Sequence, residues 1–177
     1  NTTTTVLDGF GRTVAITGPN AQNPDGPPDT LQTMDYHNSN GVQYITTHYL
    51  LEWGSDNYHR THKYYDGLQR VYRKESISDT SADNVRIDYT FKDPQKQTGE
   101  SLPYFDNGTA PVYWKNRGYD AYGRVNKLKE PFSDESGSKQ TVTTIDFLTN
   151  DNIKSTTTSP DNDSTYVETV SMQWYNG

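Results

Sequence analysis

Apolar and polar residues alternate along several short stretches of the chain, most clearly over 13–17, 85–91 and 141–147. A period of two residues predicts β-strands with one face buried. Clusters of Gly, Pro, Asn and Ser separate these stretches, and the Pro-rich residues 18–30 predict an extended surface loop. The 3.6-residue period of a helix is nearly absent, so the pattern predicts an all-β fold.

One pattern occurs three times, in residues 7–14, 65–72 and 119–126. Each copy has a Tyr or Leu, then Asp, a small residue, a bulky apolar residue, Gly or Gln, and Arg, followed by a new strand. Weaker copies are predicted at 35–44 and 147–153. This repetition indicates a fold that is built from one supersecondary unit.

The residue types of the pattern predict a strand, a tight turn and a second strand. The Asp is suited to bond backbone N–H groups in an Asx turn, and the Gly to adopt a positive φ. We expect the Arg to pair with the Asp or to stack on an aromatic ring, and the bulky residue to point into the core. One repeat cannot bury its own apolar face, so the repeats must stack. The expected motif residues are Asp8, Gly11, Arg12, Tyr65, Asp66, Arg70, Tyr119, Asp120, Gly123 and Arg124.

Composition limits both the core and the partners of the chain. Only 30% of the residues are hydrophobic, but 14 Tyr raise the aromatic share to 12%, so we expect a sheet with a thin core rather than a disordered chain. The absence of Cys excludes disulfides and cysteine metal sites. The net charge of −7 makes nucleic acid an unsuitable partner, and no apolar run is long enough for a membrane span.

The pattern Tyr-Asp-x-bulky-Gly-Arg-Val resembles the signature of the YD-repeat, or Rhs, family, and residues 119–125 match it at every position. The stretch Ser-Leu-Pro-Tyr-Phe at 101–105, followed by Tyr113 and Trp114, is similar to the repeat region of large secreted bacterial toxins. The shell components of insecticidal toxin complexes are among these. The resemblance is clearest over residues 60–130 and slightest over 21–58.

The resemblance implies an antiparallel sheet of stacked strand-turn-strand repeats. Residues 1–177 would form one YD-repeat β domain, divergent over 21–58 and rich in loops over 18–30. Family members wind such sheets into hollow shells, so an extracellular structural scaffold is implied rather than an enzyme, and no cofactor. The chain would be a wall segment of a toxin-like shell, next to YD repeats of a longer chain, or a subunit of an extracellular fibre. The paired Asp-Pro-x-Gly elements of the family's self-cleaving segment are missing, so we expect no self-proteolysis.

A chain with few repeats leaves an unpaired strand edge at each end. Its Thr-rich termini have the composition of added strands, so we expect the chain to associate with copies of itself there. The residues expected to form these strands are Thr2, Thr4, Val6, Tyr166, Val167 and Val170.

The alternative function is a binding module for glycans or a cell surface. Trp53, Trp114 and Trp174 could offer flat rings to sugars, although cross-strand packing is the favoured explanation for them. His59 and His62 would face opposite sides of a strand, which does not suit a shared metal. Residues 161–164 resemble the start of a calcium loop without its later Gly and Glu. We therefore expect no catalytic, cofactor-binding or metal-binding residue.

Overall fold

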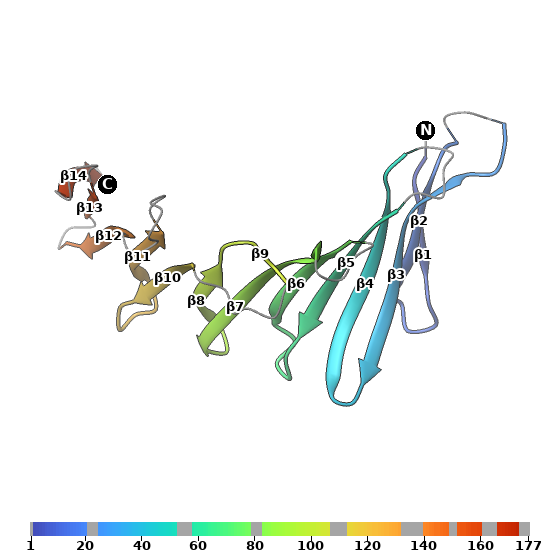
Figure 1. The fold of residues 1–177 in the computed structure, drawn as a ribbon, viewed down its shortest axis with the longest axis horizontal. Helices are drawn as coiled ribbons and strands as arrows, with labels where there is room; N and C mark the ends of the chain where they lie inside the picture. Colours follow the sequence, from blue (N-terminus) through green and yellow to red (C-terminus); the bar gives the residue numbers. More distant parts are fainter. Residues whose placement is uncertain are drawn as a thin grey trace. The chain divides into compact units, whose positions relative to one another are not determined.

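A computed structural model describes residues 2–20, 25–52, 58–78, 83–106, 113–131, 140–148, 152–160 and 166–173. These residues form fourteen β-strands and no α-helix, hence no helix that could cross a membrane (Figure 1). The strands form an antiparallel sheet and follow one another in sequence order. Only β9 (Tyr104–Phe105) departs from this order, because it pairs with β7 (Val85–Asp93). The predicted all-β fold and antiparallel sheet are confirmed.

The chain divides into two compact units. Unit 1 comprises Asn1–Ile87 and Phe105–Thr109, and unit 2 comprises Asp88–Tyr104 and Ala110–Gly177. The complete strands of unit 1 are β1 (Thr4–Leu7), β2 (Thr13–Gly18), β3 (Asp29–Ser39), β4 (Val42–Leu50), β5 (Tyr58–Tyr65) and β6 (Val71–Ile77). Those of unit 2 are β8 (Lys96–Ser101), β10 (Trp114–Tyr119), β11 (Val125–Pro131), β12 (Gln140–Phe147), β13 (Ile153–Pro160) and β14 (Tyr166–Gln173). The expectation of a single domain over 1–177 stays a prediction.

The divergent segment 21–58 contains the hairpin of β3 and β4. Asn40 and Gly41 join the two strands with φ angles of 53° and 78°, and Ser39 pairs with Val42 across the turn. Two central residues with positive φ define the type I′ turn that suits the twist of a hairpin, and Asn-Gly is its preferred sequence. Residues 35–44 therefore form a hairpin with a two-residue loop. The prediction of a weaker motif copy there is wrong.

Few of the described residues are buried, and most are half-buried or exposed. None of their hydrophobic side chains is buried, and the buried polar residues are Thr46, Thr47, Glu75, Asn84 and Ser101. The prediction that each strand buries one apolar face is wrong, because the described residues of each unit form strands and no second layer that packs on them. Alternation identifies the more apolar face of a strand, but it does not show whether another layer of the protein packs on that face.

Candidate functional site

Three hairpin turns share one backbone geometry. These motif turns comprise residues 8–12, 66–70 and 120–124. In each turn the Asp amide donates a hydrogen bond to the Arg carbonyl oxygen, at 2.9, 3.0 and 2.9 Å in chain order. The amide three residues after the Asp donates to the Asp carbonyl oxygen, at 3.0, 2.9 and 3.1 Å. The strand register shifts just before each turn. The repeated sequence pattern therefore corresponds to a repeated local structure.

The Asp side chain stabilises each motif turn through hydrogen bonds to the turn backbone and to the Arg side chain. Its Oδ1 accepts hydrogen bonds from the amides two and four residues later, all at 2.9 to 3.0 Å. Its Oδ2 accepts a hydrogen bond from the Arg Nε, at 2.7, 2.8 and 2.8 Å. The predicted Asx turn and Asp–Arg pair are confirmed in all three copies.

These bonds favour the ionised form of each motif carboxyl, because they are made to the charged oxygens. The pKa of Asp8 is lowered, chiefly by the hydrogen bond from the Arg backbone amide. The pKa of Asp66 is lowered, chiefly by the hydrogen bond from the Arg side chain. For Asp120 desolvation is the largest influence and acts to raise the pKa, but the hydrogen bonds from its Arg outweigh it and the pKa is lowered.

The fourth residue of each motif turn has a positive φ. The angle is 76° at Gly11 and 83° at Gly123, as the turn chemistry predicts. Gln69 adopts the same conformation, with a φ of 61°. A left-handed backbone costs an L residue with a side chain roughly 1–2 kcal/mol. The second motif turn thus holds a side chain at a position that favours Gly.

The bulky residue of each motif turn lies at its tip and not in a core. Phe10, Leu68 and Tyr122 are 87%, 59% and 86% exposed. The expectation that these side chains point inward is wrong. They lie beyond the last paired residues of their hairpins, and the guanidinium carbons of Arg12 and Arg124 lie 5.2 and 5.3 Å from the ring centroids of Phe10 and Tyr122.

The motif Arg connects its turn to an aromatic ring on the next strand. The guanidinium carbon of Arg12 lies 4.2 Å from the ring centroid of Tyr36 on β3. That of Arg124 lies 3.7 Å from the ring centroid of Phe147 on β12. The predicted stacking is confirmed in the first and third copies, where it joins a motif hairpin to its neighbour, as stacked repeats require.

The motif Tyr of the third copy connects the turn to the preceding strand. The hydroxyl of Tyr119 donates a hydrogen bond to the carbonyl oxygen of Gln97 on β8, at 2.7 Å. Tyr119 is the last residue of β10, and its hydroxyl group joins the end of that strand to β8.

A fourth turn closes in the same way at the predicted weaker copy. The Leu148 amide donates to the Asn152 carbonyl oxygen at 2.9 Å, and Phe147 pairs with Ile153 as Tyr119 pairs with Val125. This turn has neither the Asp nor the Arg, and no register shift is recorded between β12 and β13. Its backbone closure is that of the motif turn, with Leu148 and Asn152 at the positions of the motif Asp and Arg.

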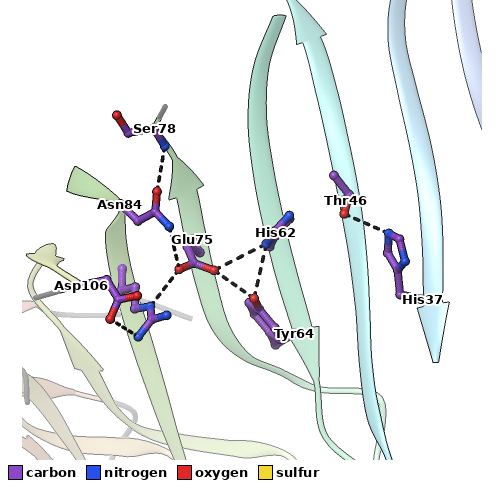
Figure 2. A network of polar contacts seen from close by, with 9 residues as sticks. His37, Thr46, His62, Tyr64, Glu75, Ser78, Asn84 and Asp106 are labelled. Carbon is purple, nitrogen blue, oxygen red and sulfur yellow. Dashed lines mark hydrogen bonds and ion pairs between the residues drawn. The ribbon is translucent and has the colours of Figure 1, made fainter. Parts of the chain in front are cut away.

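A network of polar contacts surrounds Glu75 in unit 1, as Figure 2 shows. The Glu75 side chain is only 4% exposed. Its carboxylate accepts hydrogen bonds from the Tyr64 hydroxyl and the Arg86 Nε, both at 2.9 Å, and from the Asn84 amide at 3.4 Å. The His62 Nδ1 lies 3.5 Å from the same carboxylate. We call these five residues the glutamate network.

The glutamate network extends to both sides. Arg86 also pairs with Asp106, and the amide oxygen of Asn84 accepts a hydrogen bond from the Ser78 backbone at 2.8 Å. On the other side, the ring of Tyr64 lies 5.3 Å from that of Tyr44. A buried charge is tolerated here because several donors surround it.

Burial and hydrogen bonding compete at the titratable groups of this network. Burial acts to raise the pKa of Glu75, but bonds from Tyr64 and Arg86 and the charge of Arg86 outweigh it, so the pKa is lowered. Burial lowers the pKa of His62 despite the neighbouring carboxylate. Burial, followed by the bond to Glu75, raises the pKa of Tyr64 well above its ordinary range. The network therefore favours an anionic Glu75 with a neutral imidazole and a neutral phenol beside it.

A hollow of about 380 Å³ opens in unit 1 beside two motif turns and the β3–β4 hairpin. Its lining combines amide and phenol groups with one cation and apolar surface. We call it the amide hollow, after three of its residues. Its lining includes Arg12, Tyr36, Asn38, Gln43, Tyr65 and Gln69.

The residues expected to form added strands lie on the two strands that end the sheet order. Thr4 and Val6 belong to β1, which pairs only with β2 in that order. Thr2 precedes β1 and is exposed. Tyr166, Val167 and Val170 belong to β14, which pairs only with β13 in that order.

The other candidate residues do not converge. Trp114 begins β10, whereas Trp53, Trp174 and residues 161–164 lie outside the described residues. His59 contacts the Ser76 hydroxyl at 3.2 Å, while His62 belongs to the glutamate network. In the part of the chain that the structure describes, no three His, Cys, Asp or Glu side chains group to hold a metal ion.

Comparison of the chain with family models, with curated proteins and with solved structures finds no match in any of the three.

Proposed function

We propose that the chain is an extracellular structural scaffold built of YD repeats, which extends through strand addition at its two terminal strands. The observation that carries this proposal is that both terminal strands have exposed apolar side chains and an unprotected edge. Val6 of β1 is 43% exposed, and Val167 and Val170 of β14 are 53% and 49% exposed. Neither strand contains Lys or Pro, the residues with which proteins commonly protect sheet edges from pairing.

The partial burial of the sheet supports the same proposal. Apolar side chains in the described residues remain partly accessible to water, so the hydrophobic contribution to stability is incomplete in an isolated chain. Neighbouring repeats, from a longer chain or from another copy, would increase that burial. The motif turns supply what a wall of stacked hairpins needs, because each fixes its own hairpin, and the first and third also contact the next strand through Arg12 and Arg124.

Addition of β14 of one copy to β1 of another would satisfy the free backbone groups of both strands. Such a contact joins two different surfaces, so it is heterologous and produces an open polymer unless the rotation closes a ring. The net charge of −7 opposes association, but at ~0.1 M salt charges more than about 10 Å apart are largely screened. Moderate salt should therefore promote assembly.

Sedimentation velocity over a range of protein concentrations tests this proposal. We expect the wild-type chain to form concentration-dependent assemblies and Val6→Lys to reduce them, because a Lys on an edge strand opposes strand addition. Val42→Lys is the matched control, since Val42 is 41% exposed but lies on β4, which has a strand on either side. A wild-type chain that remains monomeric in moderate salt would contradict self-assembly and favour a wall segment of a longer chain.

A further inference from the structure

Gln69 is the one departure from Gly among the three equivalent positions of the motif turns. It has a φ of 61°, a backbone conformation that residues with side chains rarely adopt. Unfavourable conformations of this kind are concentrated at binding sites, where the side chain has a task that Gly could not perform. The Gln69 amide donates a hydrogen bond to the Gln43 Oε1 at 2.8 Å, at the wall of the amide hollow.

Three polar side chains of the amide hollow come from one row of paired residues. Asn38 pairs with Gln43, and Gln43 pairs with Tyr65 on the next strand, so the three side chains point to the same face of the sheet. Within the described residues, no side-chain hydrogen bond is made by Asn38 or by the hydroxyl of Tyr65. The Gln43–Gln69 bond also leaves one amide nitrogen and one amide oxygen open to a ligand. The hollow thus offers donors and acceptors side by side.

The charge of the amide hollow favours a neutral ligand. Its lining contains no Asp, Glu or Lys, and the guanidinium of Arg12 is already paired with Asp8 at 2.7 Å. The Arg12 group also covers the ring of Tyr36 at 4.2 Å. Sugar hydroxyls both donate and accept hydrogen bonds, as do amides and phenols. A volume of about 380 Å³ is near the lower end of the ~300–1,000 Å³ range of small-molecule sites.

We propose that the amide hollow binds a neutral saccharide, with the side chains of Asn38, Gln43, Tyr65 and Gln69 bonding its hydroxyl or acetamido groups. This binding site is independent of the scaffold function, because it lies on the face beside the motif turns and uses no residue of β1 or β14. A wall of such hairpins would carry a sugar contact on one face.

Saturation-transfer difference NMR with the 177-residue chain tests the proposal, because the ligand signals are observed whether or not the chain assembles. The probes are lactose and N,N′-diacetylchitobiose, with a sulfated chondroitin disaccharide as the anionic comparison. We expect saturable transfer to at least one neutral disaccharide at millimolar concentration and none to the sulfated one. Absence of transfer to both neutral sugars, or equal transfer to the sulfated one, overturns the proposal.

The variant Gln69→Gly locates the site without threatening the fold, because Gly suits the positive φ of this turn. Loss of the amide should weaken binding about tenfold, which corresponds to about 1.4 kcal/mol. The unfolding midpoint should stay unchanged or rise. Gln32→Ala, on β3 outside the hollow, is the matched control and should bind as the wild type does. If Gln69→Gly binds as tightly as the wild type, the proposed site is wrong.

Discussion

Gly9 and Gly11 lie in the same motif turn and separate two effects of adding a side chain. An added Cβ would meet no neighbouring atom within 4 Å at either position, but only Gly11 has a positive φ. Gly11→Ala should therefore lower the free energy of unfolding by about 1–2 kcal/mol through backbone strain alone. Gly9→Ala should leave it unchanged or slightly raised.

Urea denaturation of these two variants, followed by tyrosine and tryptophan fluorescence, measures the difference. Equal shifts of the two midpoints would mean that the turn conformation does not determine the stability of this hairpin.

The motif residues whose conformation could be predicted are those that act within five residues of chain. The Asp bonds amides two and four positions later, and the Gly conformation follows from the same turn, so the sequence specifies both. The environment of Phe10 depends on whether another layer covers the turn, which no local pattern contains. The positive φ of Gln69 was missed because Gln has no special preference for it.

At the scale of strands, the glutamate network makes the stability of unit 1 depend on pH. The folded-state pKa of His62 lies below its ordinary 6.5, and that of Glu75 below its ordinary 4.5. A group with a lowered pKa binds fewer protons in the folded than in the unfolded state, so stability falls with falling pH. The His62 contribution is lost first, from about pH 6.5 downward, and the Glu75 contribution follows below about pH 4.5.

We therefore expect the urea midpoint to fall between pH 6.5 and pH 4.5, and His62→Gln to flatten this part of the profile. His59→Gln is the control on the same strand, because His59 contacts Ser76 and not the Glu75 carboxylate. If both variants keep the wild-type slope, His62 does not determine the pH dependence.

The strands themselves were predictable, but the contacts between distant strands were not. Alternation located β2, β7 and β12 because the period of two is a local property. The glutamate network draws Tyr64, Glu75 and Arg86 from three different strands. Glu75 follows Arg73 and Lys74 in the sequence, and a run of charged residues is typical of a solvated strand face, so the sequence did not indicate the network.

At the scale of the whole chain, backbone hydrogen bonding is extensive and apolar burial is incomplete. Strand pairing in sequence order satisfies the backbone groups of inner strands, whereas the described hydrophobic side chains stay partly exposed. A chain of this kind has more to gain from a neighbour than a protein with a closed core has. The terminal strands are where a neighbour can add without disturbing existing pairs.

Two edge variants can show which terminal strand of one copy pairs with which terminal strand of the next. If β14 of one copy adds to β1 of another, Val6→Lys blocks one end of each chain and Val170→Lys blocks the other. Either variant alone should then stay monomeric, because every contact needs one free β1 and one free β14. A mixture of the two variants retains one permitted contact, between β14 of the first and β1 of the second.

The mixture should form 1:1 dimers and nothing larger, and sedimentation velocity would resolve them from monomers and polymers. Pairing of β1 with β1 would instead let Val170→Lys dimerise alone, and pairing of β14 with β14 would let Val6→Lys do so. Long polymers in either variant would place the assembly contact away from the strand edges. Because both variants add one positive charge to a chain of net charge −7, electrostatic repulsion is matched and the result reports the edges alone.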